Sequence, residues 1–424
     1  MAATDPRRAI EAVWRLESTK LIAGLARFTR DLAIAEDLAH DALVAALQQW
    51  PAEGIPRNPG AWLMATGKRR AIDLLRRRTR AAGSHEVLAR ALEADRQNPE
   101  SVLHATMDDD IGDDVLRLIF TACHPVISTD ARVALTLRLV GGLSTDEIAR
   151  AFLVPEATIA QRIVRAKKTI AKAGVPFEVP RGAERLERLA SVLEVVYLVF
   201  NEGYSASAGD DLVRPGLCEE AIRLGRVLEG LAPDEAEVHG LVALMELQAS
   251  RLRARVGAGG EAILLLDQNR ARWDHLLIHH GLDALERAEY AAGPTPGPYT
   301  LQAAIAACHA RARTAEATDW RRIAALYARL ADVLPSPVVR LNHAVAVGMA
   351  EGPAAALALV DALTAQGALA SYHYAPSVRG DLLEKLGRLD EARREFDRAA
   401  TLTRNARERD LLLARSRACG RASA

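Results

Sequence analysis

The stretch LSTDEIARAFLVPEATIAQRIVRAKKTIAK, residues 143–172, decides how the N-terminal part of this chain folds. Ser144 can cap a helix, and Glu147, three residues on, can reach back to the cap, which together make a capping box. Pro155 then interrupts the pattern, because it disfavours a helical residue before it and suits the first turn of a new helix. The stretch therefore predicts two short helices joined by a tight turn, a helix-turn-helix.

The second helix of this pair, from about Glu156, is predicted to be amphipathic and basic. Its apolar residues recur at three- and four-residue spacing, which places them on one face. They are Ile159, Ile163, Ala166 and Ile170. The polar side chains on the other faces are Thr158, Gln161, Arg162, Arg165 and Lys168. Such side chains can meet phosphates and base edges in a DNA major groove, although a solvated basic helix in a bundle explains the same letters.

A second basic segment lies earlier in the chain, NPGAWLMATGKRRAIDLLRRRTR at residues 58–80. An aromatic ring stacks on any unstacked base, and Lys and Arg follow the phosphates, so this segment predicts a surface for single-stranded DNA. The candidate residues are Trp62, Lys68, Arg69, Arg70, Arg76 and Arg77. Because Leu63 and Met64 follow Trp62, a core position on an amphipathic helix is an equal alternative for this tryptophan.

The segment DLAIAEDLAHDALVAALQQW, residues 31–50, predicts a helix that displays Glu36, Asp37 and Asp41 away from its apolar face. An acidic surface repels DNA, so this helix favours a protein partner that carries positive charge. Asp37 and Asp41 are four residues apart, and we expect them to share one face that lies apart from the basic run. An ordinary solvated face is the alternative.

These three segments, in this order, resemble the sigma-2 and sigma-4 domains of a bacterial extracytoplasmic-function sigma factor over about residues 10–175. The resemblance implies two partners, promoter DNA and core RNA polymerase, which the family binds through the β′ clamp helices and the β flap. It implies that Asp37 and Asp41 contact the clamp helices. The expected function is that of a promoter-specificity subunit.

The resemblance also assigns the DNA contacts. Trp62 and the basic run after it would engage and melt the −10 element. The helix-turn-helix would read the −35 element, with Gln161, Arg162 and Arg165 at positions of the family's recognition helix. The chain departs from the family's pattern at two places. Many members carry asparagine where this chain has Arg69, and members commonly show Gly-Thr-Val where this recognition helix opens Pro-Glu-Ala-Thr-Ile.

The amino-acid composition limits the possible fold classes and functions. Half of the 424 residues are hydrophobic and only 4% are aromatic, with alanine and leucine dominant and alternating β-branched runs scarce. The sequence therefore predicts an all-α chain of about two to four domains. The formal net charge is zero, which excludes a dedicated non-specific DNA binder. Contact with DNA must be local, as suits a protein that acts with a larger partner.

Breaker residues and changes of composition divide the chain into three domains and a linker. The sigma-2-like domain is expected at residues 1–80, a linker at 81–107, the sigma-4-like helix-turn-helix domain at 108–175 and a C-terminal helical domain at 176–424. Within the linker, residues 86–94 could form a short helix. The last part is far longer than a minimal sigma factor of this type requires and must fold separately.

The last part carries helical pairs that resemble tetratricopeptide repeats. Residues 374–402 place small and apolar residues at that repeat's offsets, so that two helices pack closely. They are Gly380, Leu383, Gly387, Ala392, Phe396 and Ala399. A weaker pair spans residues 341–363, and further pairs span 219–255 and 301–334. Because a lone repeat cannot bury its own face, we expect a stacked α-solenoid with a concave binding surface.

This organisation is similar to the subgroup of these sigma factors with a long, tetratricopeptide-like extension. In that subgroup the extension replaces a separate anti-sigma partner and influences activity. Three strings resemble the subgroup's pattern, FNEGYSAS at 200–207, GPYTLQAAIAACHA at 297–310 and DWRRIAALYARL at 319–330. Asn201, Glu202 and Tyr204 could line a pocket for a protein or small-molecule ligand, although a helix C-cap before a polar loop explains the same letters.

Catalysis and metal binding find little support in the sequence. The four cysteines are widely spaced, which predicts reduced thiols rather than a zinc site or disulfides. His275 and His279 have the spacing of a zinc helix, but a glutamate after the first histidine and a third ligand are missing, so we expect them to pack between helices. With no phosphate-binding loop or nucleophile motif, we expect no enzyme activity, no cofactor and no metal.

The remaining alternatives concern function and location. The first residues contain no apolar signal core, and no apolar stretch reaches the ~18 residues that a membrane span needs, which predicts a cytoplasmic protein. Besides a sigma factor, the chain could be a helix-turn-helix regulator that replaces no sigma factor, or a tetratricopeptide scaffold with a vestigial N-terminal part. The sigma-2-like segment argues against the first, and the intact basic run argues against the second.

Overall fold

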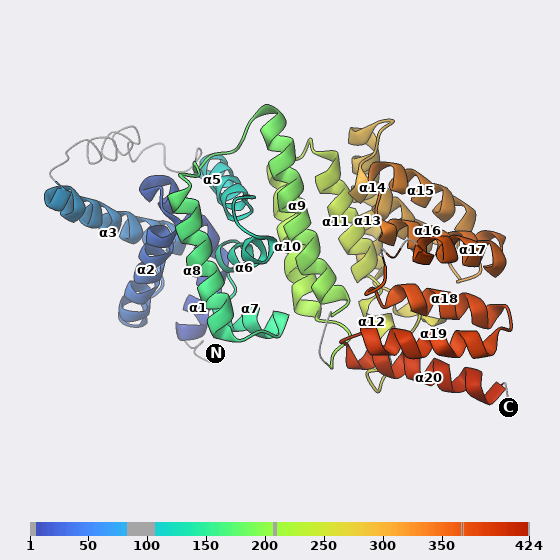
Figure 1. The fold of residues 1–424 in the computed structure, drawn as a ribbon. Helices are drawn as coiled ribbons and strands as arrows, with labels where there is room; N and C mark the ends of the chain where they lie inside the picture. The colour runs from blue at the N-terminus through green and yellow to red at the C-terminus, as the bar shows by residue number, and fades with distance from the viewer. Residues whose placement is uncertain (1–5, 83–106, 207–209, 366, 368, 423–424) are drawn as a thin grey trace. The chain divides into compact units, whose positions relative to one another are not determined.

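The computed structural model describes residues 6–82, 107–206, 210–365, 367 and 369–422 (Figure 1). These residues form helices and their connections, and the β contact among them is an isolated bridge between Val256 and Ala262. The all-α prediction is therefore confirmed. The chain divides into two compact units, Met1–Val195 (unit 1) and Val196–Ala424 (unit 2). The helix expected at residues 86–94 lies outside the described residues.

Unit 1 contains the three segments that the sequence analysis singled out. Its helices are α1 (Pro6–Thr29), α2 (Leu32–Glu53), α3 (Pro59–Ala82), α5 (Met107–Ala122), α6 (Thr129–Leu139), α7 (Thr145–Phe152), α8 (Glu156–Lys172) and the first part of α9 (Gly182–Tyr204). Helix α1 packs against α2, α3 and α5. Asp31 starts α2, since its carboxylate accepts hydrogen bonds from the Ala33 and Ile34 amides at 2.8 and 3.1 Å.

The first part of α9 belongs to unit 1 through polar contacts with α5, α6 and the turn between them. The Arg188 guanidinium donates to the Phe120 carbonyl at 2.8 Å, and the Ser191 hydroxyl donates to the Cys123 carbonyl at 2.8 Å. Unit 1 therefore ends inside α9, at Val195, whereas composition places the change of character at residue 176.

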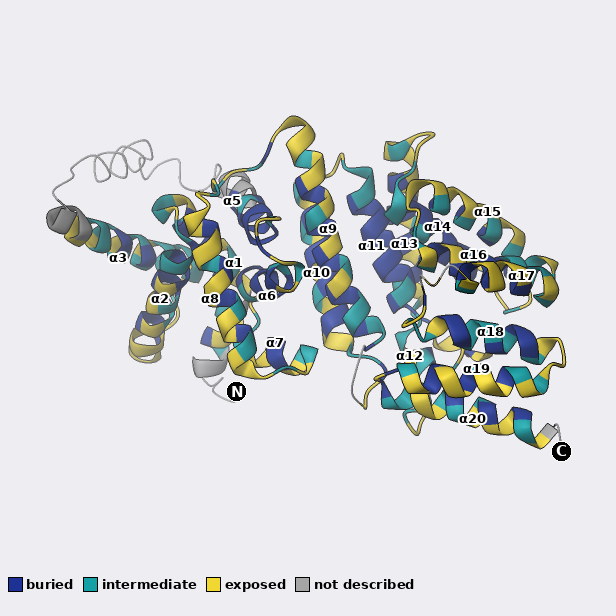
Figure 2. Ribbon diagram, viewed as in Figure 1, coloured by how far each residue is buried: buried dark blue, intermediate teal, exposed yellow. Residues whose placement is uncertain are grey.

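Unit 2 is a succession of helices that pack on their neighbours in the chain. After the second part of α9 they are α10 (Pro215–Leu231), α11 (Ala236–Ala249), α12 (Leu252–Arg255), the 3₁₀ turns η2 (Leu265–Asp267) and η3 (Arg270–Arg272), α13 (His275–Ala292), α14 (Pro298–Arg311), α15 (Trp320–Val333), α16 (Pro337–Glu351), α17 (Pro353–Ala365), α18 (Tyr374–Lys385), α19 (Leu389–Leu402) and α20 (Ala406–Ala422). The helical pairs that the sequence predicts are present. Figure 2 shows α11 buried along most of its length, and α13 and α14 pack against it.

The pair α18 and α19 packs as the small residues predict. A Cβ atom at Gly380 would come within 2.8 Å of the Phe396 ring, so only glycine allows this approach. Gly387 turns the chain between the two helices with a φ of +73°. The other predicted contact positions are fully buried, namely Leu383, Ala392, Phe396 and Ala399.

One buried side chain, Asn405, joins two segments of unit 2 that are far apart in the sequence. Asn405, 0% exposed, donates through its amide nitrogen to the Ala206 and Asp211 carbonyls at 3.1 and 2.8 Å. The Arg407 guanidinium donates to the Asp210 carbonyl at 3.2 Å beside it. We call the Asn405 hydrogen bonds the Asn405 clasp. The clasp ties the chain after α9 to the segment between α19 and α20, and so joins parts of unit 2 that are 194 and 199 residues apart in the sequence.

Candidate nucleic-acid and polymerase interface

Helices α7 and α8 form the predicted helix-turn-helix. The Ser144 hydroxyl accepts from the Glu147 amide at 3.1 Å, and the Glu147 carboxylate accepts from the Ser144 amide at 2.7 Å, so the capping box is present. Leu153 ends α7 in the left-handed region with a φ of 50°, and α8 begins at Glu156 directly after Pro155. The four residues predicted for the inner face of α8 are all buried, namely Ile159, Ile163, Ala166 and Ile170.

The outer face of α8 carries the residues predicted to read DNA. Gln161, Arg165 and Lys168 are exposed, and Thr158 is half-buried. Within the described part of the chain, neither Arg165 nor Lys168 has an ion pair. Arg162 differs, because its guanidinium lies 3.2 Å from the Asp130 carboxylate at the start of α6. Arg162 must leave Asp130 before it can contact a base, whereas its neighbours are already free.

The predicted −10 residues lie on α3, whose first turn is capped by Asn58 at 3.0 Å from the Ala61 amide. The exposed basic residues of this helix are Arg69, Arg76 and Arg77, and Lys68 and Arg70 are half-buried. Trp62 is also half-buried, and its ring packs edge-on against the buried Trp50 ring at 5.3 Å between centroids. Trp62 therefore contributes to packing and stays partly exposed, so both interpretations of this residue keep support.

The two acidic residues predicted to bind the polymerase differ in their surroundings. Asp37 is exposed and has no hydrogen bond or ion pair to any described residue. The Asp41 carboxylate lies 3.3 Å from the Arg70 guanidinium. The expectation that both acids lie apart from the basic run is therefore wrong for Asp41. The reason is that α3 packs along α2, which brings the two helices' charged residues together.

Glu36 corrects a second expectation, because it is buried, 6% exposed, instead of being displayed. Helices α6 and α8 cover this side of α2. The Glu36 carboxylate accepts from the Arg138 guanidinium at 2.6 Å and pairs with the Lys167 ammonium. We call these three residues the Glu36 junction. Burial and the nearby Arg138 charge lower the pKa of His40, whose ring lies 3.1 Å from that guanidinium.

The sequence gives no local signal for this junction. Glu36 and its two partners are separated by 102 and 131 residues. Lys167 stands next to Lys168, yet one lysine points into unit 1 and the other is exposed, because adjacent helical residues differ by about 100° in direction. Only the packing of α2 against α6 and α8 distinguishes them.

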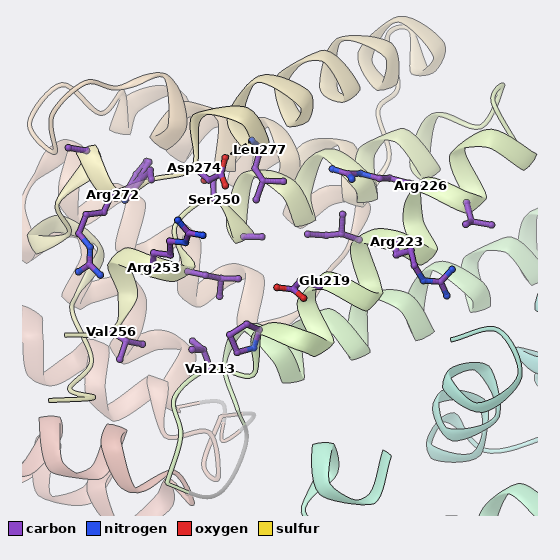
Figure 3. A pocket seen from close by; sticks show the side chains of 17 residues that line it. Val213, Glu219, Arg223, Arg226, Ser250, Arg253, Val256, Arg272, Asp274 and Leu277 are labelled. Atoms are coloured by element: carbon purple, nitrogen blue, oxygen red, sulfur yellow. Dashed lines mark hydrogen bonds between the residues drawn. The ribbon is translucent and has the colours of Figure 1, made fainter. Parts of the chain in front are cut away.

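Unit 2 contains a cavity of about 1200 Å³ lined by α10, the end of α11, α12 and the start of α13 (Figure 3). Four arginines line it, Arg223, Arg226, Arg253 and Arg272. Arg223 pairs with Glu220 and Arg226 with Glu246, at 2.7 and 2.6 Å. Figure 3 shows Arg223 and Arg226 at one end of the cavity and Arg272 at the other, so their charges spread apart rather than converge.

The residues proposed to line a pocket near the end of α9 have different roles. Asn201 lines a second cavity, of about 810 Å³. Glu202 instead pairs with Arg214, and the Tyr204 ring lies 3.9 Å from the Arg255 guanidinium carbon. The helix continues through all three positions to Tyr204, so a helix end does occur here, directly after them.

The histidine and cysteine positions bear on metal binding. His275 and His279 are exposed on α13, so the expectation that they pack between helices is wrong; the helix buries Ile278 and Gly281 instead. Among the described residues, no group of three or more histidine, cysteine or acidic side chains could hold a metal ion. The four cysteines are buried, and none of them forms a disulfide. No described helix is long and apolar enough to cross a membrane.

Comparison with known proteins agrees with the arrangement of unit 1. Residues 16–81 match sigma-70 region 2, and residues 117–170 match sigma-70 region 4. Residues 188–289 match a family of unknown function (DUF6596). The chain is 47% identical over 390 residues to an uncharacterized protein of Rhizobium meliloti (strain 1021), an alignment that covers 91% of this chain and 90% of that protein.

The matched regions contain the candidate contacts. Asp37, Asp41, Trp62 and the basic residues of α3 fall in region 2, and the outer face of α8 falls in region 4. The helices of unit 2 follow both regions. The chain therefore belongs to the sigma-70 family, as an RNA polymerase sigma factor of the extracytoplasmic-function type that carries a C-terminal extension.

Proposed function

We propose that this protein directs core RNA polymerase to specific promoters in the cytoplasm, and that unit 2 regulates this activity. The observation that carries the proposal is the division of α8. Its inner face is buried, and its outer face presents Gln161, Arg165 and Lys168 to solvent. A helix that reads the −35 element needs this division, because the inner face holds the fold while the outer side chains reach base edges and phosphates.

The −10 contact and the polymerase contact are coupled through Asp41 and Arg70. Their ion pair, at 3.3 Å, joins two side chains that are 58% and 40% exposed. Such a surface pair contributes only about 0–1 kcal/mol, so a DNA phosphate can replace the carboxylate. When Arg70 turns to DNA, Asp41 becomes free to join Asp37 in binding basic residues of the polymerase, for which the β′ clamp helices are the expected site.

Reading both promoter elements requires unit 1 to open. The −10 and −35 elements are about 25 base pairs apart, which is ~85 Å of B-form DNA. Helices α3 and α8, with 24 and 17 residues, are about 36 and 26 Å long. Both pack against α2, and even end to end they fall short of that span. Promoter binding therefore requires α8 to leave α2 at the Glu36 junction.

The regulatory part of the proposal rests on tethering. Unit 2 is part of the same chain and is joined to unit 1 within α9, so the two units cannot diffuse apart. Unit 2 can therefore act on unit 1 without a separate inhibitor, in response to a protein or small-molecule ligand. We assign it no catalytic step and no cofactor.

The test is run-off transcription with purified core polymerase, the full chain and a library of promoters. We expect transcripts from a defined subset that core polymerase alone does not produce. With Arg165→Ala, discrimination between promoters should fall by about 1–3 kcal/mol. With Lys168→Ala, affinity should fall for all sequences and the salt slope should shrink by about one. Specific DNA binding without transcription would instead favour a helix-turn-helix regulator.

A further inference from the structure

The cavity of about 810 Å³ in unit 2 carries chemistry that the sigma regions do not use. Its walls come from α9, α11, α14, α15 and α16, from residues 372–374, and from the segment between residues 402 and 408. The Asn405 clasp lies in that last segment and holds it to the chain after α9. A cavity of this size accommodates one small organic molecule, and the clasp keeps its wall in place.

Tyrosine hydroxyls supply hydrogen-bond donors to this cavity. Burial raises the pKa of Tyr197 and raises that of Tyr327 to about 12, so both hydroxyls keep their protons at neutral pH. The Tyr197 hydroxyl donates to the Gln302 amide oxygen at 3.3 Å. The Tyr327 hydroxyl has no hydrogen bond to any residue that the structure describes. It is therefore a donor available to a ligand.

Arg251 gives the cavity a positive charge that no described acid neutralises. Its side chain lines the cavity, is half-buried, and has no ion pair within the described ranges. The nearby His309 does not add to this charge. Burial, followed by the charges of Arg251 and Arg270, lowers the pKa of His309 to about 3, so the imidazole is neutral at neutral pH.

The acidic residue in the lining, Glu408, is already occupied. Its two carboxylate oxygens accept from the Tyr374 hydroxyl at 2.7 Å and the Thr403 hydroxyl at 2.8 Å. His373 lies 3.1 Å from the same carboxylate. These three contacts occupy the Glu408 carboxylate, which forms no ion pair with Arg251. Arg404, exposed at the same cavity, adds a second positive charge.

We propose that this cavity binds a small organic carboxylate with a flat apolar body, whose carboxylate pairs with Arg251. A guanidinium and a phenolic hydroxyl are the donors that a carboxylate needs. Leu244, Ile305 and Leu330 line the same cavity and, with the tyrosine rings, suit the apolar body. A role of this ligand in transcription rests on the proposed function, but binding to the cavity does not.

The experiment is calorimetric titration of the full chain with phenylacetate and indole-3-acetate. The controls are phenylacetamide and indole-3-acetamide, which have the same shapes without the charge. We expect the carboxylates to bind at least about tenfold more tightly than the amides. Arg251→Gln should remove this preference. Arg253→Gln is the matched control, because Arg253 is two residues away, exposed, and lines the larger cavity (Figure 3).

Tyr327→Phe keeps the ring and removes one hydroxyl, so it tests the site without a change of charge. We expect several-fold weaker binding of both carboxylates with unchanged thermal unfolding. Absence of binding by either carboxylate up to about 10 mM overturns the proposal, and so does equal binding by wild type and Arg251→Gln. Tighter binding of peptides with a free C-terminus than of either acid overturns it in favour of a peptide site. Because no polymerase or DNA is present, these outcomes leave the sigma-factor proposal untouched.

Discussion

Two polar contacts join residues far apart in the sequence, one in each unit, and they are built from different chemistry. In unit 1 the Glu36 junction pairs a buried carboxylate with Arg138 and Lys167, 102 and 131 residues later. In unit 2 the Asn405 clasp uses a neutral amide that donates to carbonyls 199 and 194 residues earlier. One contact is made of charges, and the other is made of uncharged hydrogen bonds.

The difference separates a contact that can open from one that stays closed. When an ion pair opens, each charge regains strong hydration, so the net cost of opening is small. When the Asn405 clasp opens, a fully buried amide and two carbonyls lose their hydrogen bonds. These neutral groups gain less from hydration than charged groups do, so the net cost of opening is larger. The proposed function requires α8 to separate from α2 at the junction, whereas the clasp lies in a segment that lines a cavity. Each contact therefore has the chemistry that its role requires.

The largest expected effect comes from charge reversal at the junction. Glu36→Lys places three cations together where one anion bound two, which should cost the closed arrangement about 3–5 kcal/mol. Helix α8 should then leave α2. Energy transfer between dyes on cysteines introduced at Gln48 and Lys172, both exposed, measures the separation, since the native cysteines are buried.

Asp37→Lys is the control for this prediction, because Asp37 is adjacent, exposed and unpaired among described residues. It should leave energy transfer unchanged and weaken capture of the chain by core polymerase. If Glu36→Lys gives the same energy transfer as wild type, the junction does not hold unit 1 closed.

The features predicted correctly from the sequence depend on residues close together in the chain. The Ser144 capping box and the buried face of α8 follow from contacts within four residues, and local spacing encodes these directly. The fit of Gly380 against Phe396 follows from one helical pair with a short turn. Such features need no knowledge of what else covers the helix.

The features that sequence analysis missed depend on distant residues. Glu36 and Asp37 are both acidic and adjacent on α2, and nothing local indicates that only the first is covered by α6 and α8. Asp41 meets Arg70 for the same kind of reason, since α3 packs along α2. No sequence motif marks Asn405 as a contact residue. Its partners are backbone carbonyls, which every residue has, so the sequence does not distinguish them.

The second prediction concerns the clasp. Asn405→Ala removes the amide and leaves the Ala206 and Asp211 carbonyls without their donor, which should cost about 2 kcal/mol. Hydrogen exchange should accelerate at residues 210–214. Asn342→Ala is the control, because Asn342 is also an asparagine of unit 2 but is exposed. Equal exchange in wild type and Asn405→Ala would show that the clasp does not hold these segments together.

The third prediction concerns low pH, which should lower the stability of unit 2. The Asn405 clasp should not contribute to this loss, because its groups carry no charge. The pKa of His309 in the folded chain is about 3, below its ordinary value of 6.5. The unfolded chain therefore binds the proton more readily, and stability present above pH 6.5 is lost as the pH falls toward 3. Between pH 7 and 5.5 the loss should be about 1.3 kcal/mol. Urea unfolding of His309→Gln should show a flatter pH dependence; an unchanged dependence would assign the acid response to another group.

The smallest effect should distinguish the two contacts directly. Raising NaCl from about 0.05 to 0.5 M shortens the Debye length from ~14 to ~4 Å, which screens charges but not amide hydrogen bonds. Because Arg138 and Lys167 are only partly exposed, the junction should weaken by less than about 1 kcal/mol. Wild-type energy transfer between residues 48 and 172 should fall slightly, while exchange at residues 210–214 stays constant. In Glu36→Lys the sign should reverse, since salt then screens repulsion. Equal salt responses of junction and clasp would contradict the assignment of one contact as ionic and switchable and the other as permanent.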